Sequence, residues 1–167
     1  MTRALLVIDI QNDYFPGGTL PLHQAEEVET RVVAAIERAK RAGDRVVLVR
    51  HVSPAKTGLF AEGGSGVVIR PAILSAAGDA PVVTKQVADA FQDTDLAEHL
   101  AGVDELLVCG MMTQNCVVFT AMSRDAEGFD VGVIGDLCAA PSEIVHRIAL
   151  NALGSKLRVV NSDDCRD

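Results

Sequence analysis

Short apolar runs alternate along the chain with longer segments in which apolar residues recur every three or four positions. Continuous apolar runs closed by polar residues are typical of strands that are buried on both faces in a parallel sheet. The runs predict strands at residues 4–8, 45–52, 81–84, 105–111, 130–137 and 157–160. The helical period predicts helices at residues 25–42, 94–100, 115–128 and 142–153.

The ends and faces of these helices follow from the same pattern. Gly43 is the expected stop of the first helix, since glycine favours the left-handed conformation that ends many helices. In the last helix we expect Ile144, Ile148 and Leu153 to point inward.

Strands that alternate with helices imply a parallel sheet joined by right-handed crossovers. The expected fold class is therefore α/β, with three layers, and residues 1–167 are expected to form a single domain. In such a sheet the loops at the carboxyl ends of the strands form the ligand crevice.

The connection at residues 53–80 has no sustained period and holds several proline or glycine clusters. Loops longer than about 15 residues are uncommon in compact domains and are usually functional. We expect a lid or a partner contact here. The Gly63-Gly64-Ser65-Gly66 run is interpreted as flexible loop, because no Gly-Lys-Ser/Thr follows it as in a P-loop.

Composition narrows the function classes. A net charge of −8 with 15 Lys and Arg argues against a nucleic-acid partner, whose phosphates require cations. No apolar run reaches the length of a membrane span and no secretory leader is visible, so we expect a cytoplasmic protein. The four cysteines lack zinc-site spacing, so neither disulfides nor a structural metal is expected, and no cofactor is predicted.

One cysteine stands where a reactive thiol would be well placed. Cys116 follows a strand and a short turn and opens a new helical period, where free N–H groups and the helix dipole favour a thiolate. Asp9 and Lys85 end two other strands, so all three meet at one edge of the sheet. A carboxylate, an ammonium and a thiol together form a plausible nucleophile set. Taken singly, each has an ordinary reading: a buried core thiol, a turn former and a surface charge.

Three blocks of the chain resemble the motifs of the isochorismatase-like cysteine hydrolases. They are Leu5-Leu6-Val7-Ile8-Asp9-Ile10-Gln11-Asn12-Asp13, Val83-Thr84-Lys85 with Ala90-Phe91, and Gly110-Met111-Met112-Thr113-Gln114-Asn115-Cys116-Val117. The resemblance implies a sheet of order 3-2-1-4-5-6 with Asp9, Lys85 and Cys116 as a catalytic triad. It also implies a cis peptide at Met111-Met112, an oxyanion hole made by the N–H groups of Met112 and Cys116, a small-molecule substrate and a homo-oligomer.

The activity implied is hydrolysis of a small amide or related C–N bond through a thioester on Cys116. Two alternatives stay open: hydrolysis of a vinyl ether such as isochorismate, and a non-catalytic redox or binding protein in which Cys116 senses oxidants. The candidate substrate-binding residues are Gln11, Phe15, Phe60, Phe91 and Thr113.

Two departures from the family pattern concern the substrate. Nicotinamidases of this superfamily hold a metal through an Asp-x-His after the second strand, whereas Val49-Arg50-His51 stands here, so no metal is expected. Asp89 replaces an asparagine found before the Ala-Phe pair in many relatives.

The remaining polar residues are given structural roles. Structural or surface roles are expected for the four histidines, with a reservation for His51 at the active edge. Asp136 is expected to support the Cys116 loop through a hydrogen bond, and Cys165 is expected to be exposed.

Overall fold

The computed structural model describes residues 1–165 around a single six-stranded sheet. The end of the predicted domain, at residue 167, lies outside this part. The strands are β1 (Arg3–Ile8), β2 (Arg45–His51), β3 (Val82–Lys85), β4 (Glu105–Met111), β5 (Asp130–Ala139) and β6 (Arg158–Val160). Every neighbouring pair is parallel and the order is β3-β2-β1-β4-β5-β6. The predicted α/β class and strand order are confirmed.

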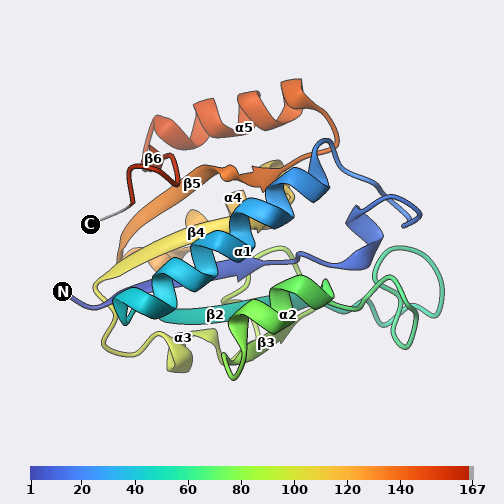
Figure 1. The fold of residues 1–167 in the computed structure, drawn as a ribbon, viewed down its shortest axis with the longest axis horizontal. Coiled ribbons are helices and arrows are strands. Elements are labelled where there is room, and N and C mark those ends of the chain that lie inside the picture. The colour runs from blue at the N-terminus through green and yellow to red at the C-terminus, as the bar shows by residue number, and fades with distance from the viewer. Residues whose placement is uncertain (166–167) are drawn as a thin grey trace.

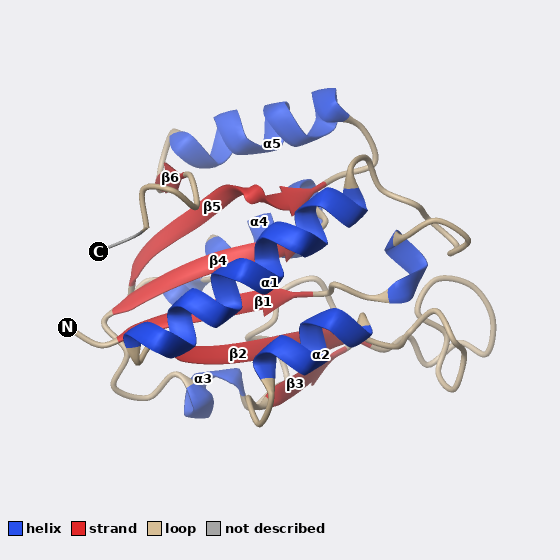
Figure 2. Ribbon diagram, in the orientation of Figure 1, coloured by secondary structure: helices blue, strands red, loops and turns tan. Residues whose placement is uncertain are grey.

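Helices cover both faces of this sheet (Figure 1). They are α1 (Ala25–Ala42), α2 (Pro71–Ala77), α3 (Leu96–His99), α4 (Val118–Ala121) and α5 (Glu143–Gly154). In Figure 2, α1 and α2 lie in front of the strands and α4 lies behind them. This separation follows from right-handed crossovers, since the chain moves from β1 toward one edge and from β4 toward the other.

The core includes the central strands and one stripe of α1. In β1 every residue after Arg3 is buried, as expected for a strand with helices on both sides. The buried stripe of α1 includes Val28, Val32 and Ile36. Gly43 ends this helix in the left-handed conformation, with φ of 80°, as predicted.

The structure corrects two of the predicted helices. The segment predicted as one helix at residues 115–128 is divided into a π-helical turn at Thr113–Val117, the short α4, and a 3-10 turn at Arg124–Ala126. In α5, Leu153 is 2% exposed, but Ile144 and Ile148 are 68% and 64% exposed, so the prediction that both isoleucines point inward was wrong. Apolar spacing located this helix but not the face that packs on the sheet.

The connection at residues 53–80 is more ordered than its composition indicates. It contains α2, which begins at Pro71, a residue whose fixed φ suits the first helical turn. The carboxylate of Asp13 accepts hydrogen bonds from Phe60 N at 2.7 Å and from Thr19 N and Oγ1. The backbone N–H of Asp13 donates to Gly66 O at 3.0 Å. The connection is therefore tied to the loop that follows β1, at the carboxyl ends of the strands (Figure 1).

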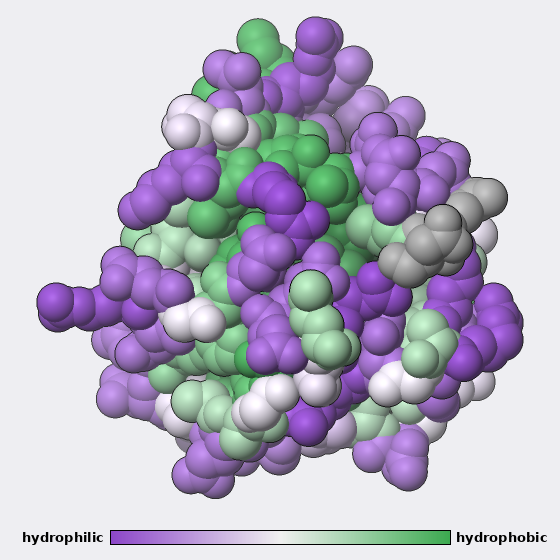
Figure 3. Space-filling model, turned by 90° about the vertical axis from the view of Figure 1, so that its left-hand side faces the viewer, coloured by the Kyte–Doolittle hydropathy of each residue, from purple (hydrophilic) through white to green (hydrophobic). Residues whose placement is uncertain are grey.

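The surface carries scattered apolar side chains. Figure 3 looks at the end of the molecule where the strands begin, and hydrophobic residues gather there among hydrophilic ones. Exposed large apolar residues also include Phe119, Met122 and the two isoleucines of α5. The homo-oligomer stays a prediction, as does the cytoplasmic location. Within residues 1–165, no helix has both the length and the apolar character that crossing a bilayer requires.

Gly110 offers a test of how tightly β4 lies against β1. Its φ is +122°, and a Cβ there would stand 2.1 Å from Ile8 O, so alanine must strain the backbone and push the strands apart. We expect Gly110→Ala to lower the free energy of unfolding by about 2–5 kcal/mol in urea titrations. The matched control is Gly43→Ala, where the φ is also positive but no atom lies within 4 Å, with an expected loss of about 1–2 kcal/mol. Equal losses in the two variants would contradict this account.

Candidate active site

Four neighbouring strands deliver the functional side chains to one edge of the sheet. Asp9 follows β1 with a left-handed backbone, φ 53°, which turns the chain away from the strand. His51 ends β2 and Lys85 ends β3, and these two residues are register partners on adjacent strands. Cys116 lies in the π-helical turn that follows β4. The predicted meeting of Asp9, Lys85 and Cys116 at the carboxyl edge is what the structure shows.

The ammonium of Lys85 stands at the centre of this group. Its Nζ lies 2.9 Å from Asp9 Oδ2 and 3.2 Å from Cys116 Sγ. It also lies 3.0 Å from His51 Nδ1 and donates to Val87 O at 3.0 Å. One charge therefore contacts the acid, the thiol and the imidazole together.

The charged groups are removed from water. The side chains of Asp9 and Lys85 are both 0% exposed, and Cys116 as a residue is 2% exposed. Burial disfavours ions, so it raises the pKa of Asp9, while the charge of Lys85 acts in the opposite direction. An isolated buried carboxylate would be costly, and the nearby ammonium offsets that cost.

Burial also raises the pKa of Cys116, to about 12, with a further contribution from the negative charge of Asp9 and an opposing one from Lys85. The helix N-terminus was expected to favour the thiolate, but burial is the larger influence on this sulfur and favours the thiol. The thiol therefore keeps its proton at neutral pH. A carboxylate oxygen of Asp9 lies within 4.8 Å of the sulfur.

The backbone around the sulfur has an unusual form. The Met111–Met112 peptide bond is cis, as the resemblance implies. The next residue, Thr113, is buried, and its hydroxyl is hydrogen-bonded to His146 Nδ1 of α5 at 2.7 Å. This bond joins the turn that carries Cys116 to α5, and it occupies the hydroxyl of Thr113, one of the predicted substrate-binding residues.

Two of the predicted substrate-binding residues lie beside the site. Gln11 binds the backbone of His51 twice, accepting from its N–H at 2.9 Å and donating to its carbonyl at 2.8 Å. The Phe60 ring lies 5.7 Å from the His51 ring and packs edge-on against Tyr14 at 4.8 Å. Both residues therefore shape the surroundings of His51.

The other two predicted phenylalanines pack elsewhere. Phe15 is buried under the guanidinium of Arg70, whose Cζ lies 4.1 Å from the ring centroid. Phe91 stacks on Phe129 with the ring centroids 6.3 Å apart. Among the described residues, no ring contact or hydrogen bond joins either phenylalanine side chain to Lys85 or to the three side chains around its ammonium, those of Asp9, His51 and Cys116.

Two acidic residues have structural roles. Asp136 accepts hydrogen bonds from the N–H and hydroxyl of Ser162, so it holds the segment after β6 and not the Cys116 loop, contrary to prediction. Asp89 accepts from Ser123 Oγ at 2.7 Å and from Phe91 N at 2.9 Å. Its carboxylate is therefore used within the scaffold.

The sequence prediction gave His51 too little weight. The sequence places His51 at the end of a predicted strand, at the same sheet edge as Asp9, Lys85 and Cys116, but the prediction gave this position only as a reservation. With Asp9 and Cys116 it forms a set whose possible ligand atoms all lie within 4.8 Å of one another. The three do not fit a metal ion as they stand, because the Lys85 ammonium already lies 2.9–3.2 Å from each of them and would repel a cation.

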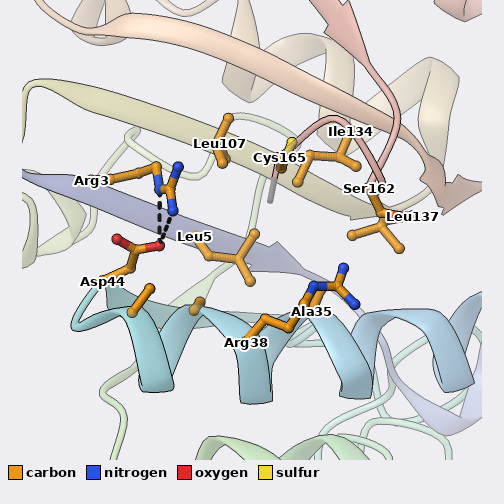
Figure 4. Close-up of a pocket in the computed structure, with 12 residues that line it drawn as sticks. Arg3, Leu5, Ala35, Arg38, Asp44, Leu107, Ile134, Leu137, Ser162 and Cys165 are labelled. Carbon is orange, nitrogen blue, oxygen red and sulfur yellow. Dashed lines mark hydrogen bonds and ion pairs between the residues drawn. The ribbon is translucent and has the colours of Figure 1, made fainter. Parts of the chain in front are cut away.

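A separate cavity of about 80 Å³ lies between α1 and the sheet (Figure 4). Apolar side chains such as Leu5 and Ile134 line it, and the Arg3–Asp44 ion pair stands at one side. None of the predicted site residues lines this cavity. Cys165 does, and it is half-buried there, whereas it was predicted to be exposed.

The buried ion pair makes a prediction about stability. In Lys85→Met the Asp9 carboxylate loses its counter-charge, so we expect a loss of about 3–5 kcal/mol in the free energy of unfolding at about pH 8. The loss should shrink toward about pH 5, because the buried Asp9 then has a raised pKa and takes up a proton more readily than in the unfolded chain. Urea titrations at both pH values measure this. The double variant Asp9→Asn/Lys85→Met should recover part of the loss, and a deficit that does not change with pH would contradict the account.

Comparison with known proteins agrees with this geometry. The family described as Isochorismatase domain matches residues 3–164. The uncharacterized isochorismatase family protein YddQ of Bacillus subtilis is 32% identical over 177 residues, covering 98% of each chain. Nicotinamidase 3 of Arabidopsis thaliana is 31% identical over 161 residues, covering 88% of this chain and 78% of its own.

A solved structure shows the same fold. The putative isochorismatase hydrolase from Oleispira antarctica superimposes with a TM-score of 0.90 at 29% identity, over 98% of this chain and 95% of that one. The resemblance drawn from the three sequence blocks is confirmed. With a family match along nearly its whole length and this strand order, the chain belongs to the isochorismatase family.

Proposed function

We propose that the protein is a cysteine-dependent hydrolase that cleaves a small amide or related C–N bond through a thioester. The observation that carries the proposal is the buried Lys85 ammonium within 3.2 Å of both the Asp9 carboxylate and the Cys116 sulfur. The similarity to a nicotinamidase supports an amide as the substrate class.

The first half of the reaction forms the thioester. Asp9 takes the proton of Cys116, and the thiolate, stabilised by Lys85, attacks the carbonyl carbon. The N–H groups of Met112 and Cys116 are proposed to bind the resulting oxyanion, and one such donor is typically worth about 3–4 kcal/mol. When the C–N bond breaks, Asp9 returns its proton to the departing nitrogen, so ammonia or an amine leaves.

The second half releases the acid. Asp9, again unprotonated, takes a proton from water, and the hydroxide attacks the thioester carbonyl. The C–S bond breaks, the proton returns to the sulfur, and a carboxylic acid leaves. Lys85 transfers no proton in either half of the reaction, and its charge offsets the negative charge shared by Asp9 and Cys116.

The alternatives are separated by the state of the sulfur and by the product. A sensing thiol needs a lowered pKa so that it is a thiolate at rest, whereas burial raises the pKa of Cys116. This favours catalysis over sensing. Hydrolysis of a vinyl ether would use the same residues but release no ammonia, so product analysis distinguishes it.

The test is a screen of small primary amides and carbamoyl compounds, monitored for ammonia and for an acyl adduct by mass spectrometry. We expect a thioester adduct on Cys116, no adduct in Cys116→Ala, and a rate about 10²–10⁴-fold lower in Asp9→Asn. Cys165→Ser is the matched control and should keep full activity, because Cys165 lines the separate cavity between α1 and the sheet. Neither ammonia nor an adduct across the panel would refute the proposal.

A further inference from the structure

The Lys85 ammonium has four polar neighbours but donates hydrogen bonds to three of them. An ammonium has three N–H donors. Three acceptors lie in hydrogen-bond geometry: His51 Nδ1 at 3.0 Å, Val87 O at 3.0 Å and Cys116 Sγ at 3.2 Å. These three acceptors use all three N–H groups.

The Asp9 carboxylate is left outside this arrangement. Its Oδ2 is 2.9 Å from the ammonium nitrogen, which makes an ion pair, yet neither carboxylate oxygen receives a well-aligned hydrogen bond from it. The positive charge of Lys85 therefore stabilises the Asp9 carboxylate, while the carboxylate lone pairs remain available to accept a proton. A base that must accept the thiol proton needs that freedom.

The imidazole of His51 is suited to accept and not to donate at this nitrogen. Because an ammonium offers only donors, Nδ1 accepts and the ring proton belongs on Nε2. Burial first, and the charge of Lys85 second, lower the pKa of His51 to about 4. The ionisable groups that share its surroundings are Lys85 from β3, Asp9 after β1 and Cys116 after β4. The ring is therefore neutral at physiological pH.

His51 is also held in place. Gln11 binds both its backbone N–H and its carbonyl, and the Gln11 side chain donates further to Val67 O at 2.8 Å. Register pairing with Lys85 places the two side chains at neighbouring strand ends. An acceptor fixed in this way can set the orientation of an ammonium.

We propose that His51 is a positioning residue that, by accepting one N–H of Lys85, directs another N–H to Cys116 and leaves the Asp9 carboxylate free to take the thiol proton. Without the imidazole, the acceptor left to this N–H among residues 1–165 is Asp9 Oδ2, which lies 2.9 Å from Nζ. The ammonium would then turn toward the carboxylate. The thiolate would lose a donor and the base would be weakened, so both effects slow formation of the nucleophile.

This inference rests on the proposed function for its biological meaning, but its test needs no substrate. The measurement is the rate of alkylation of Cys116 by iodoacetamide across a pH series, resolved from the other three cysteines by peptide mass spectrometry. The comparison uses His51→Asn and His51→Leu. Asparagine places Oδ1 the same number of bonds from the backbone as Nδ1, whereas leucine places a methyl group there.

We expect His51→Leu to react about 10- to 100-fold more slowly near neutral pH, with the midpoint of the pH profile moved upward. His51→Asn should stay within about threefold of the parent protein, because the acceptor is retained. Where an amide substrate is in hand, the leucine variant should lower kcat and leave KM nearly unchanged. A merely structural role for the ring would not produce rescue by asparagine together with a shifted pH profile.

His51→Gln gives a second comparison if the leucine variant does not fold. Its amide has the same polarity as asparagine but reaches the position of Nε2, so we expect it to be as slow as leucine. A leucine or glutamine variant with the parent pH profile, or an asparagine variant as slow as the other two, would overturn the inference. A shifted profile in a protein that releases no ammonia from any amide would leave the inference standing and refute the proposed function alone.

Discussion

The site depends on one buried positive charge. Lys85 ends a four-residue edge strand, and its side chain is 0% exposed. An ammonium without water is costly unless its donors and its charge are both compensated. Here three acceptors take the donors and one carboxylate balances the charge. Each of these groups therefore has a reason to lie where it does, and the removal of any one leaves another uncompensated.

The sheet topology makes this compensation possible. The chain runs from β1 outward to β3 and then returns to β4 on the other side of β1. The carboxyl ends of β1 and β4 thus form the point where the strand order reverses, which is where open parallel sheets bind ligands. Asp9 and Cys116 come from these two strands, while Lys85 reaches them from the edge of the sheet. Residues that are far apart along the chain thus become neighbours at one edge of the sheet.

Burial shifts the pKa of the Cys116 thiol and of the Asp9 carboxyl in the same direction. It raises the pKa of both Cys116 and Asp9, while Lys85 opposes this in each case. A protonated thiol beside a carboxylate of raised basicity transfers its proton more readily than it would to an ordinary aspartate. In the proposed mechanism, the sulfur is therefore a protonated thiol at rest and becomes a nucleophile once Asp9 takes its proton. This differs from a cysteine activated by a helix N-terminus alone, where the thiolate persists.

The sequence by itself determined which residues share one edge of the sheet. Buried apolar runs end at Asp9, at Lys85 and at the turn before Cys116, and the ends of parallel strands lie at the same edge. The tertiary structure alone decided the hydrogen-bond partners of Lys85. His51 lies 34 positions away in the chain, and it becomes a partner only through the β2–β3 register. The outward face of Ile144 and Ile148 was likewise undetermined, because apolar spacing shows that a helix has a stripe but not what covers it. Local pattern follows from backbone periodicity, whereas burial, register and pKa depend on distances that only the packed fold defines.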